Sequence, residues 1–149
     1  MKKLSLRKIT DEMYEKVNAD KIIHEVESAK RYYYETQTQY LKEILETIGL
    51  EGQENYLKGR HSPKGKYMFL KEDKEFIIEM LMQFTKKMEP LRRADFLNAD
   101  DEFVVWLSEG ILRLFKHNEV SEEKLREFSC AINKRVDYPL RKQRAIIKK

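Results

Sequence analysis

The side chains best suited to chemistry in this sequence are the cations between residues 58 and 66. Five basic or potentially basic residues fall within nine positions, with no acidic residue among them: Lys58, Arg60, His61, Lys64 and Lys66. Side chains of this kind contact phosphate groups, which gives affinity for nucleic acid without reading its sequence. We therefore expect these five residues to contact DNA phosphates.

The same stretch has the composition of a β-hairpin. It contains three residues that break helices and favour turns: Gly59, Pro63 and Gly65. The aromatic and branched segments 56–57 and 67–69 on either side are typical of short strands. The pattern predicts a basic hairpin, called the wing below, followed by a helix that starts near Glu72.

A second polar group lies at the start of a helix predicted over residues 36–48. Gln and Thr side chains can hydrogen-bond base edges in a major groove. The candidates for base contact are Gln37, Thr38, Gln39 and Lys42. Glu43 and Glu46 favour the alternative, an ordinary solvated face, because carboxylates repel phosphate.

Other site chemistry has little support in the sequence. The three histidines stand far apart, and none forms a metal-ligand spacing with another His or with Cys130. No Gly-rich phosphate loop and no Ser nucleophile motif occurs. We expect neither a bound metal, nor a cofactor, nor enzymatic activity.

Apolar residues recur at helical spacing along most of the chain. The pattern predicts short helices from Thr10 to Val17 and after Asn18, and later helices capped by Asn98 or Asp100 and by Ser121. The three successive tyrosines 32–34 cannot share one helix face, so we expect them to pack at a helix junction. The alternative is that one of them contacts a phosphate or a base. Gly110 inside a helix favours a close helix crossing.

The basic tail after Pro139 allows two interpretations. Its five cations predict a loosely ordered arm that supplies charge. Alternatively, the tail is a final helix, and the apolar side chains that dock it on the bundle are Leu140, Ile146 and Ile147.

Composition sets the broad class. The chain has 149 residues and a formal net charge of +4, which allows a polyanionic partner without requiring one. Its single cysteine excludes an internal disulfide and fits a reducing compartment. No window reaches the apolar length of a membrane span, and the N-terminus has no apolar run of a secretory signal. We expect a cytoplasmic protein.

The order helix, helix, basic hairpin, apolar helix resembles a winged helix-turn-helix DNA-binding domain. The stretch from Gly49-Leu50 through Arg60, Gly65, Tyr67 and Glu72-Asp73 to Ile77 also resembles the wing and following helix of MerR-like regulators. The chain departs from that family because Arg31-Tyr32-Tyr33 comes too early for the recognition-helix pattern and no single long dimerisation helix is evident. The resemblance implies DNA binding, but it carries over no DNA site and no effector ligand.

The sequence thus predicts a mainly α protein, with a winged helix-turn-helix over residues 1–90 and a helical region over residues 91–149 that packs on it or dimerises. The expected function is sequence-dependent binding of double-stranded DNA, as a transcriptional regulator. The alternative is a non-enzymatic helical interaction module, an adaptor or inhibitor, whose basic hairpin meets an acidic protein. We expect a homodimer, because the helices around 76–88 and 103–115 carry more apolar surface than one small domain readily hides.

Overall fold

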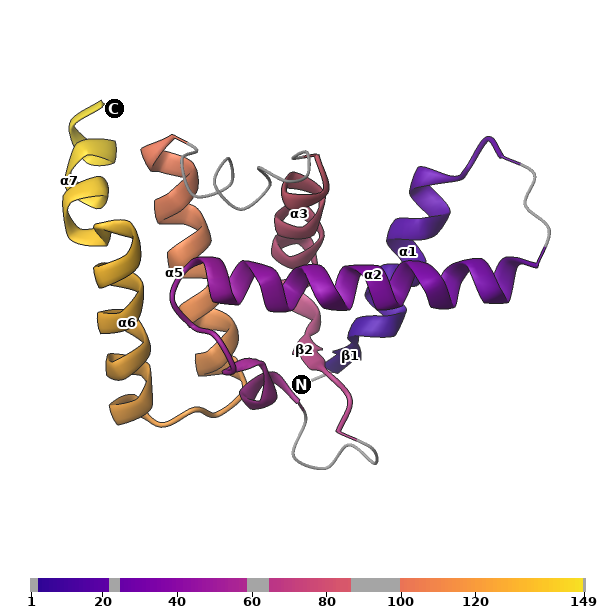
Figure 1. Ribbon diagram of the computed structural model, residues 1–149, viewed down its shortest axis with the longest axis horizontal. Helices are drawn as coiled ribbons and strands as arrows, with labels where there is room; N and C mark the ends of the chain where they lie inside the picture. The colour runs from indigo at the N-terminus through magenta and orange to yellow at the C-terminus, as the bar shows by residue number, and fades with distance from the viewer. Residues whose placement is uncertain (1–2, 22–24, 59–64, 87–99, 149) are drawn as a thin grey trace.

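The computed structural model describes residues 3–21, 25–58, 65–86 and 100–148, and these are mainly helical, as predicted. The α-helices are α1 (Leu6–Val17), α2 (Val26–Thr47), α3 (Lys74–Thr85), α5 (Asp101–His117), α6 (Glu122–Val136) and α7 (Tyr138–Lys148). α2 runs across α1, α3 and α5, while α6 and α7 lie beside α5 (Figure 1). None of the described helices combines the length and apolar character that crossing a membrane requires.

A two-stranded antiparallel sheet joins the N-terminus to the middle of the chain. β1 (Lys3–Ser5) pairs with β2 (Met68–Leu70), with Leu4 opposite Phe69. Directly opposite residues share a face of the sheet, and both of these side chains are buried. Their contact closes the core at this end of the molecule. The sequence pattern had not predicted β1.

The predicted hairpin is wrong in its first strand. Tyr56 and Leu57 belong to a 3-10 helix, η1 (Glu54–Leu57), and β2 takes β1 as its partner instead. One isolated antiparallel bridge, between Lys58 and Tyr67, is what the described residues retain of the hairpin. β1 is the better partner because its pairing brings Leu4 against Phe69, whereas the ring of Tyr56 packs on Phe128.

The predicted turn between two helices near residue 36 is also absent. Residues 26–47 form one unbroken helix of 22 residues, and no Gly or Pro interrupts this range. Tyr33 packs edge-on against Tyr14 of α1, with 5.8 Å between ring centroids, which confirms the packing interpretation for this tyrosine. Tyr32 is instead exposed. A helix-turn-helix is therefore not confirmed.

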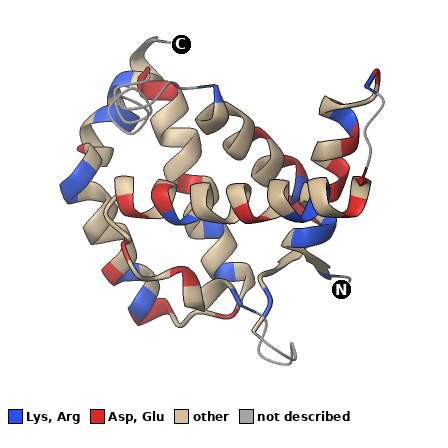
Figure 2. Cartoon of the chain, turned by 45° about the vertical axis from the view of Figure 1, so that its right-hand side comes forward, with Lys and Arg blue, Asp and Glu red and all other residues tan. Residues whose placement is uncertain are grey.

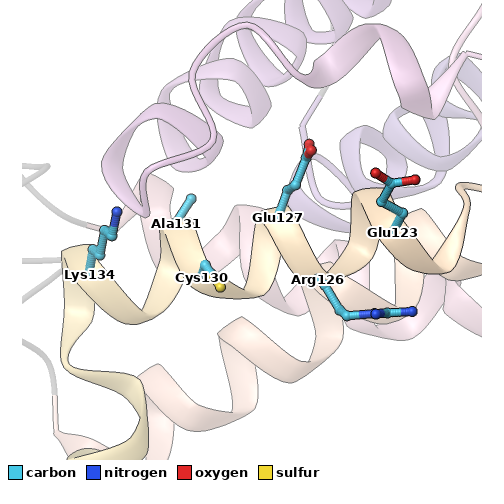
Figure 3. Close-up of a pocket in the computed structure, with 6 residues that line it drawn as sticks. All are labelled: Glu123, Arg126, Glu127, Cys130, Ala131 and Lys134. Carbon is cyan, nitrogen blue, oxygen red and sulfur yellow. The ribbon is translucent and has the colours of Figure 1, made fainter.

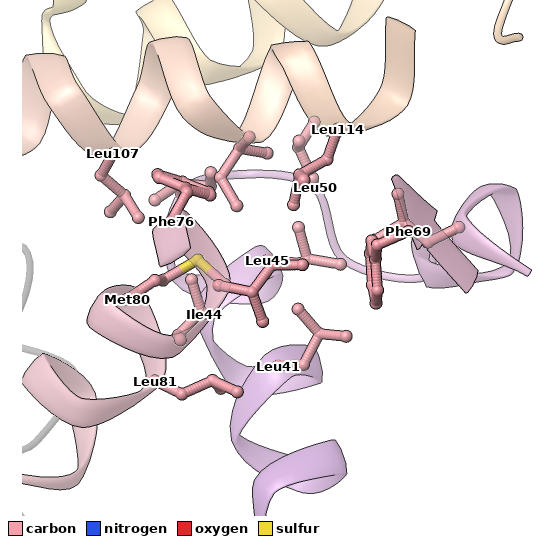
Figure 4. Close-up of a cluster of buried hydrophobic side chains, with 14 of the residues drawn as sticks. Leu41, Ile44, Leu45, Leu50, Phe69, Phe76, Met80, Leu81, Leu107 and Leu114 are labelled. Carbon is pink, nitrogen blue, oxygen red and sulfur yellow. The ribbon is translucent and has the colours of Figure 1, made fainter. Parts of the chain in front are cut away.

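One hydrophobic core joins the two predicted regions (Figure 4). Phe76 of α3 lies against Trp106 of α5, with 4.7 Å between ring centroids, and its ring fills the space beside Gly110. A Cβ at Gly110 would overlap that ring, so the predicted close crossing is confirmed. The side chains of α3 that suggested a partner chain are buried within this one: Phe76, Ile77, Met80, Leu81 and Phe84. For α3, that argument for a homodimer therefore fails.

The basic tail forms helix α7, packed on α5 and α6. Arg141 Nη1 and Arg144 Nε lie 3.4 Å and 3.2 Å from the two carboxylate oxygens of Asp101 in α5. Ala145 is buried, but Leu140, Ile146 and Ile147 are exposed. The loosely ordered arm is therefore wrong, and so is docking through the isoleucines, because charge pairs on one side of α7 hold it in place.

Helix caps follow the predicted chemistry at two of four positions. Asn18, the predicted start of the second helix, instead ends α1, where its Nδ2 donates to the Tyr14 carbonyl at 2.9 Å. Asp100 Oδ1 accepts the Phe103 N–H at 2.9 Å, and Ser121 Oγ accepts the Lys124 N–H at 3.2 Å. At the first helix the cap is Ser5, because Leu6 is drawn into the core and the helix begins there. The predicted cap, Thr10, is buried inside α1.

Candidate nucleic-acid interface

The β1–β2 pairing gathers cations from segments far apart in the sequence. Lys3 lies opposite Leu70, so it comes next to Lys71, the residue that follows β2. At the other end of the sheet, the Leu6 N–H donates to the Tyr67 carbonyl at 3.0 Å, which brings the start of α1 beside Lys66. We call this cluster the wing base: Lys3, Arg7, Lys58, Lys66 and Lys71.

The size of the sheet suits a polyanion. Each strand has three residues, so the two ends of the sheet are about 10 Å apart. One DNA strand carries about three phosphates over that length of helix axis. Lys3, Lys66 and Lys71 are all exposed, which leaves their side chains accessible at the two ends.

Two cations of the wing base rest on tyrosine rings. Lys58 Nζ lies 5.4 Å from the Tyr67 ring centroid, and Arg7 Cζ lies 5.9 Å from that of Tyr34. Burial raises the pKa of Tyr67 to about 12, with smaller contributions from Glu54 and Tyr34, so its ring stays neutral. A ring holds a cation in place without neutralising its charge. Arg7 is partly compensated, because its Nε also bonds Asp11 at 2.9 Å.

Carboxylates also occur around the wing base. Glu72 follows Lys71 and is exposed, and Glu54 lies close enough to influence Tyr67. Asp11 and Glu27 also pair with Arg7, so four carboxylates face the five cations and the region keeps only a small positive charge. Lys and Arg mark the start of α1 and both sides of the grey trace below it (Figure 2).

The structure describes only part of the predicted phosphate site. Lys58 and Lys66 belong to the wing base, whereas Arg60, His61 and Lys64 lie outside the described residues. Lys3 and Lys71 were not predicted to join the site. The sequence signal for Lys3 was the alternation of polar and apolar residues from Lys3 to Leu6, which is typical of a half-buried strand, whereas Lys71 joins only through the register of the sheet.

The predicted base-reading residues are not presented together. Gln37 is only 1% exposed, because this side of α2 faces the core, so as a base contact it is wrong. Thr38 Oγ1 donates to the Tyr34 carbonyl at 2.8 Å. Gln39 and Lys42 are exposed, but Glu35 is exposed on the same helix. The outer side of α2 therefore has mixed charge.

A separate polar cluster joins the start of α3 to the end of α5. The buried carboxylate of Asp73 has its Oδ2 2.8 Å from His117 Nδ1 and its Oδ1 3.6 Å from Arg113 Nε. His117 Nε2 lies 3.9 Å from Glu72. A His–carboxylate pair is a common component of acid–base sites, but here it connects two elements through an enclosed carboxylate. Sequence spacing missed it because the partners are 44 residues apart.

A hollow along α6 is a weaker candidate for a binding site than the wing base. It is lined by Glu123, Arg126, Glu127, Cys130, Ala131 and Lys134. Glu123 and Glu127 point to one side of the helix and Arg126 to the other (Figure 3). This mixture favours no single charge of ligand. Among the described residues, no cluster of three or more His, Cys, Asp or Glu side chains could hold a metal ion.

Comparisons of the chain with family models, with curated proteins and with solved structures found no match.

Proposed function

We propose that this protein binds the phosphate backbone of double-stranded DNA through the wing base and acts as a transcriptional regulator in the cytoplasm. The observation that supports it best is the register of the sheet, which places Lys3 beside Lys71. Lys3 and Lys71, which are 68 residues apart in the sequence, therefore lie at the same end of the sheet, and both side chains are exposed.

The wing base supplies affinity in two ways. Exposed Lys3, Lys66 and Lys71 replace counterions on the phosphates, which favours binding at low salt. Lys58 and Arg7 lose less side-chain freedom on binding, because tyrosine rings already hold them. Gln39 and Lys42 remain the candidates for base contact on α2.

The test is the salt dependence of duplex binding, measured by fluorescence anisotropy. Replacing Lys3→Gln together with Lys71→Gln removes two phosphate contacts, so the slope of log K against log salt should become shallower by about 2. The matched control is Lys21→Gln with Lys86→Gln. These exposed lysines lie beyond the ends of α1 and α3 that point away from the sheet.

Two results would overturn the proposal. One is an absence of duplex binding by the folded wild-type protein at low salt. The other is an equal loss of affinity in the control pair, which would show that net charge matters and the wing base does not.

A second candidate function, an interaction module for an acidic protein, is favoured by a groove between α5 and α6. The groove has a volume of about 410 Å³ and includes Leu112 and Leu125, with three cations and one carboxylate around them: Arg113, Lys116, Arg126 and Glu109. An acidic amphipathic helix fits this pattern. Lys116→Glu with Arg126→Glu should then abolish binding of a designed acidic amphipathic peptide and leave duplex binding unchanged.

A further inference from the structure

A hollow of about 440 Å³ opens between η1 and the turn that joins α5 to α6, two segments that lie side by side in Figure 1. Sites for small organic ligands have volumes of roughly 300–1,000 Å³. Its walls carry an aromatic ring, two amides, two cations and one carboxylate: Tyr56, Asn55, Asn118, Lys58, Lys124 and Glu119. These are the functional groups that recognise a base together with a phosphate.

Tyr56 supplies a flat surface at the solvent boundary. Its side chain is 42% exposed, yet its ring is supported edge-on by the buried Phe128, with 5.7 Å between ring centroids. A half-exposed ring with a rigid support is suited to stacking with a nucleobase. Tyr32 of α2 offers a contrast, because it is 72% exposed and lies outside the hollow.

The two cations lie on opposite walls. Lys124 Nζ is 5.8 Å from the Tyr56 ring centroid and 3.1 Å from Glu127 Oε2. Lys58 Nζ rests on Tyr67. The ring contact of Lys58 leaves its N–H donors available for a charge-assisted hydrogen bond to phosphate, and Lys124 has further N–H donors besides the one that Glu127 accepts.

The polar walls favour a nucleotide over a bare polyanion. Asn118 is fixed because its Nδ2 donates to the Leu114 carbonyl at 3.0 Å, and Asn55 is exposed on the facing segment. Asn amides bond base edges in pairs of hydrogen bonds. The two lysines face Glu119 and Glu127, so the site would hold a phosphate through the N–H donors of two ammonium groups and not through an excess of positive charge.

We propose that this hollow binds one nucleotide, with its base stacked on Tyr56 and its phosphate held by Lys58 and Lys124. The amides of Asn55 and Asn118 would bond the base edge. The ligand is either a free mononucleotide or an unpaired nucleotide of a single strand, since both present the same base and phosphate. The hollow requires no duplex, so the inference goes beyond the proposed DNA binding.

The experiment titrates the full chain with adenosine 5′-monophosphate, a short single-stranded oligonucleotide and inorganic phosphate, using calorimetry. Binding of either nucleotide probe above that of inorganic phosphate is expected, and the stronger of the two identifies the source. Tyr56→Leu should weaken it by about tenfold or more, because a stacking surface is lost. Tyr56→Phe keeps the ring and should bind as wild type, and Tyr32→Leu is the control at an exposed tyrosine elsewhere.

The readouts separate this inference from the function proposed above. If neither nucleotide probe binds, or if Tyr56→Leu and Tyr32→Leu weaken binding equally, the nucleotide site is refuted whatever the duplex assay shows. If Tyr56→Leu fails to fold, the Lys124→Gln variant tests the nucleotide site in its place. It should weaken binding and flatten its salt dependence, and unchanged binding refutes the site.

Discussion

Asp73 connects two parts of the molecule through one carboxylate. It is the last residue of η2 (Lys71–Asp73) and directly precedes α3, and its partners His117 and Arg113 belong to α5. Asp73 is nearly fully buried, whereas its two partners reach solvent. Loss of a partner therefore leaves a carboxylate that water reaches poorly, which is more costly than losing a surface ion pair.

Replacing His117→Ala should lower the free energy of unfolding by about 2 kcal/mol, because it removes the shortest bond to Asp73. Urea denaturation at neutral pH measures the change. Glu72→Gln is the control, since Glu72 is exposed and 3.9 Å from the ring, and it should change stability little. Equal effects of the two substitutions would contradict the argument.

Tyr67 gives the fold a dependence on alkaline pH. Its pKa is raised from 10.0 to about 12 in the folded protein, mainly by burial, so the unfolded chain ionises first as pH rises. Stability from this group is complete below pH 10 and is lost between pH 10 and about 12. Tyr67→Phe lacks this ionisation, so its free energy of unfolding should fall less over that range. At the midpoint of the range, the variant should have lost about 1 kcal/mol less than the wild-type protein. Parallel curves for the two proteins, measured by urea denaturation, would contradict this.

At the scale of elements, α7 is held by its charged side. Asp101 is largely buried and meets both Arg141 and Arg144, while Lys142 Nζ lies 3.2 Å from Glu109 Oε1. The Tyr138 hydroxyl also donates to Glu109 at 2.9 Å. These contacts connect α7 to the start and the middle of α5.

Deleting residues 141–149 should destabilise the protein by about 2–3 kcal/mol and lower its melting temperature by roughly 5–10 °C. The deletion leaves Asp101 without both arginines and uncovers the surface beneath Ala145. Gln143→Ala is the control, because this α7 side chain is exposed and lies outside the apolar row, so it should not affect melting. An unchanged melting temperature after the deletion would show that α7 contributes charge alone.

Local patterns predicted much of the helical structure. Caps at Asp100 and Ser121 and the crossing at Gly110 depend on nearby residues or on one small side chain, so the sequence contained their signals. One feature depends on a distant partner and was missed: β2 had two possible neighbours, and only tertiary packing of Leu4 decides for β1. The inward position of Gln37 could have been predicted, because Leu41 and Ile44, four and seven residues on, share its side of α2.

For the whole molecule, a homodimer remains a prediction, but on a different surface. The apolar residues of α3 are internal, whereas α7 exposes Leu140, Ile146 and Ile147. We expect a second copy to cover this row, so light scattering should give about twice the 18.0 kDa chain mass. Ile147→Asp should yield the monomer. A monomeric wild-type protein would refute the prediction.

The pairing of Lys3–Ser5 with Met68–Leu70 also affects the order in which the protein folds. Contacts within a helix join residues only a few positions apart. This sheet must instead close a loop of most of the first half of the chain, which costs entropy before any contact forms. β1 should therefore join late, after α2 and α3 have packed. Leu4→Ala would then speed unfolding and leave the folding rate almost unchanged, whereas Ile44→Val inside α2 would slow folding. In a growing chain, the cations near its start would not take their places in the wing base until β2 has been synthesised.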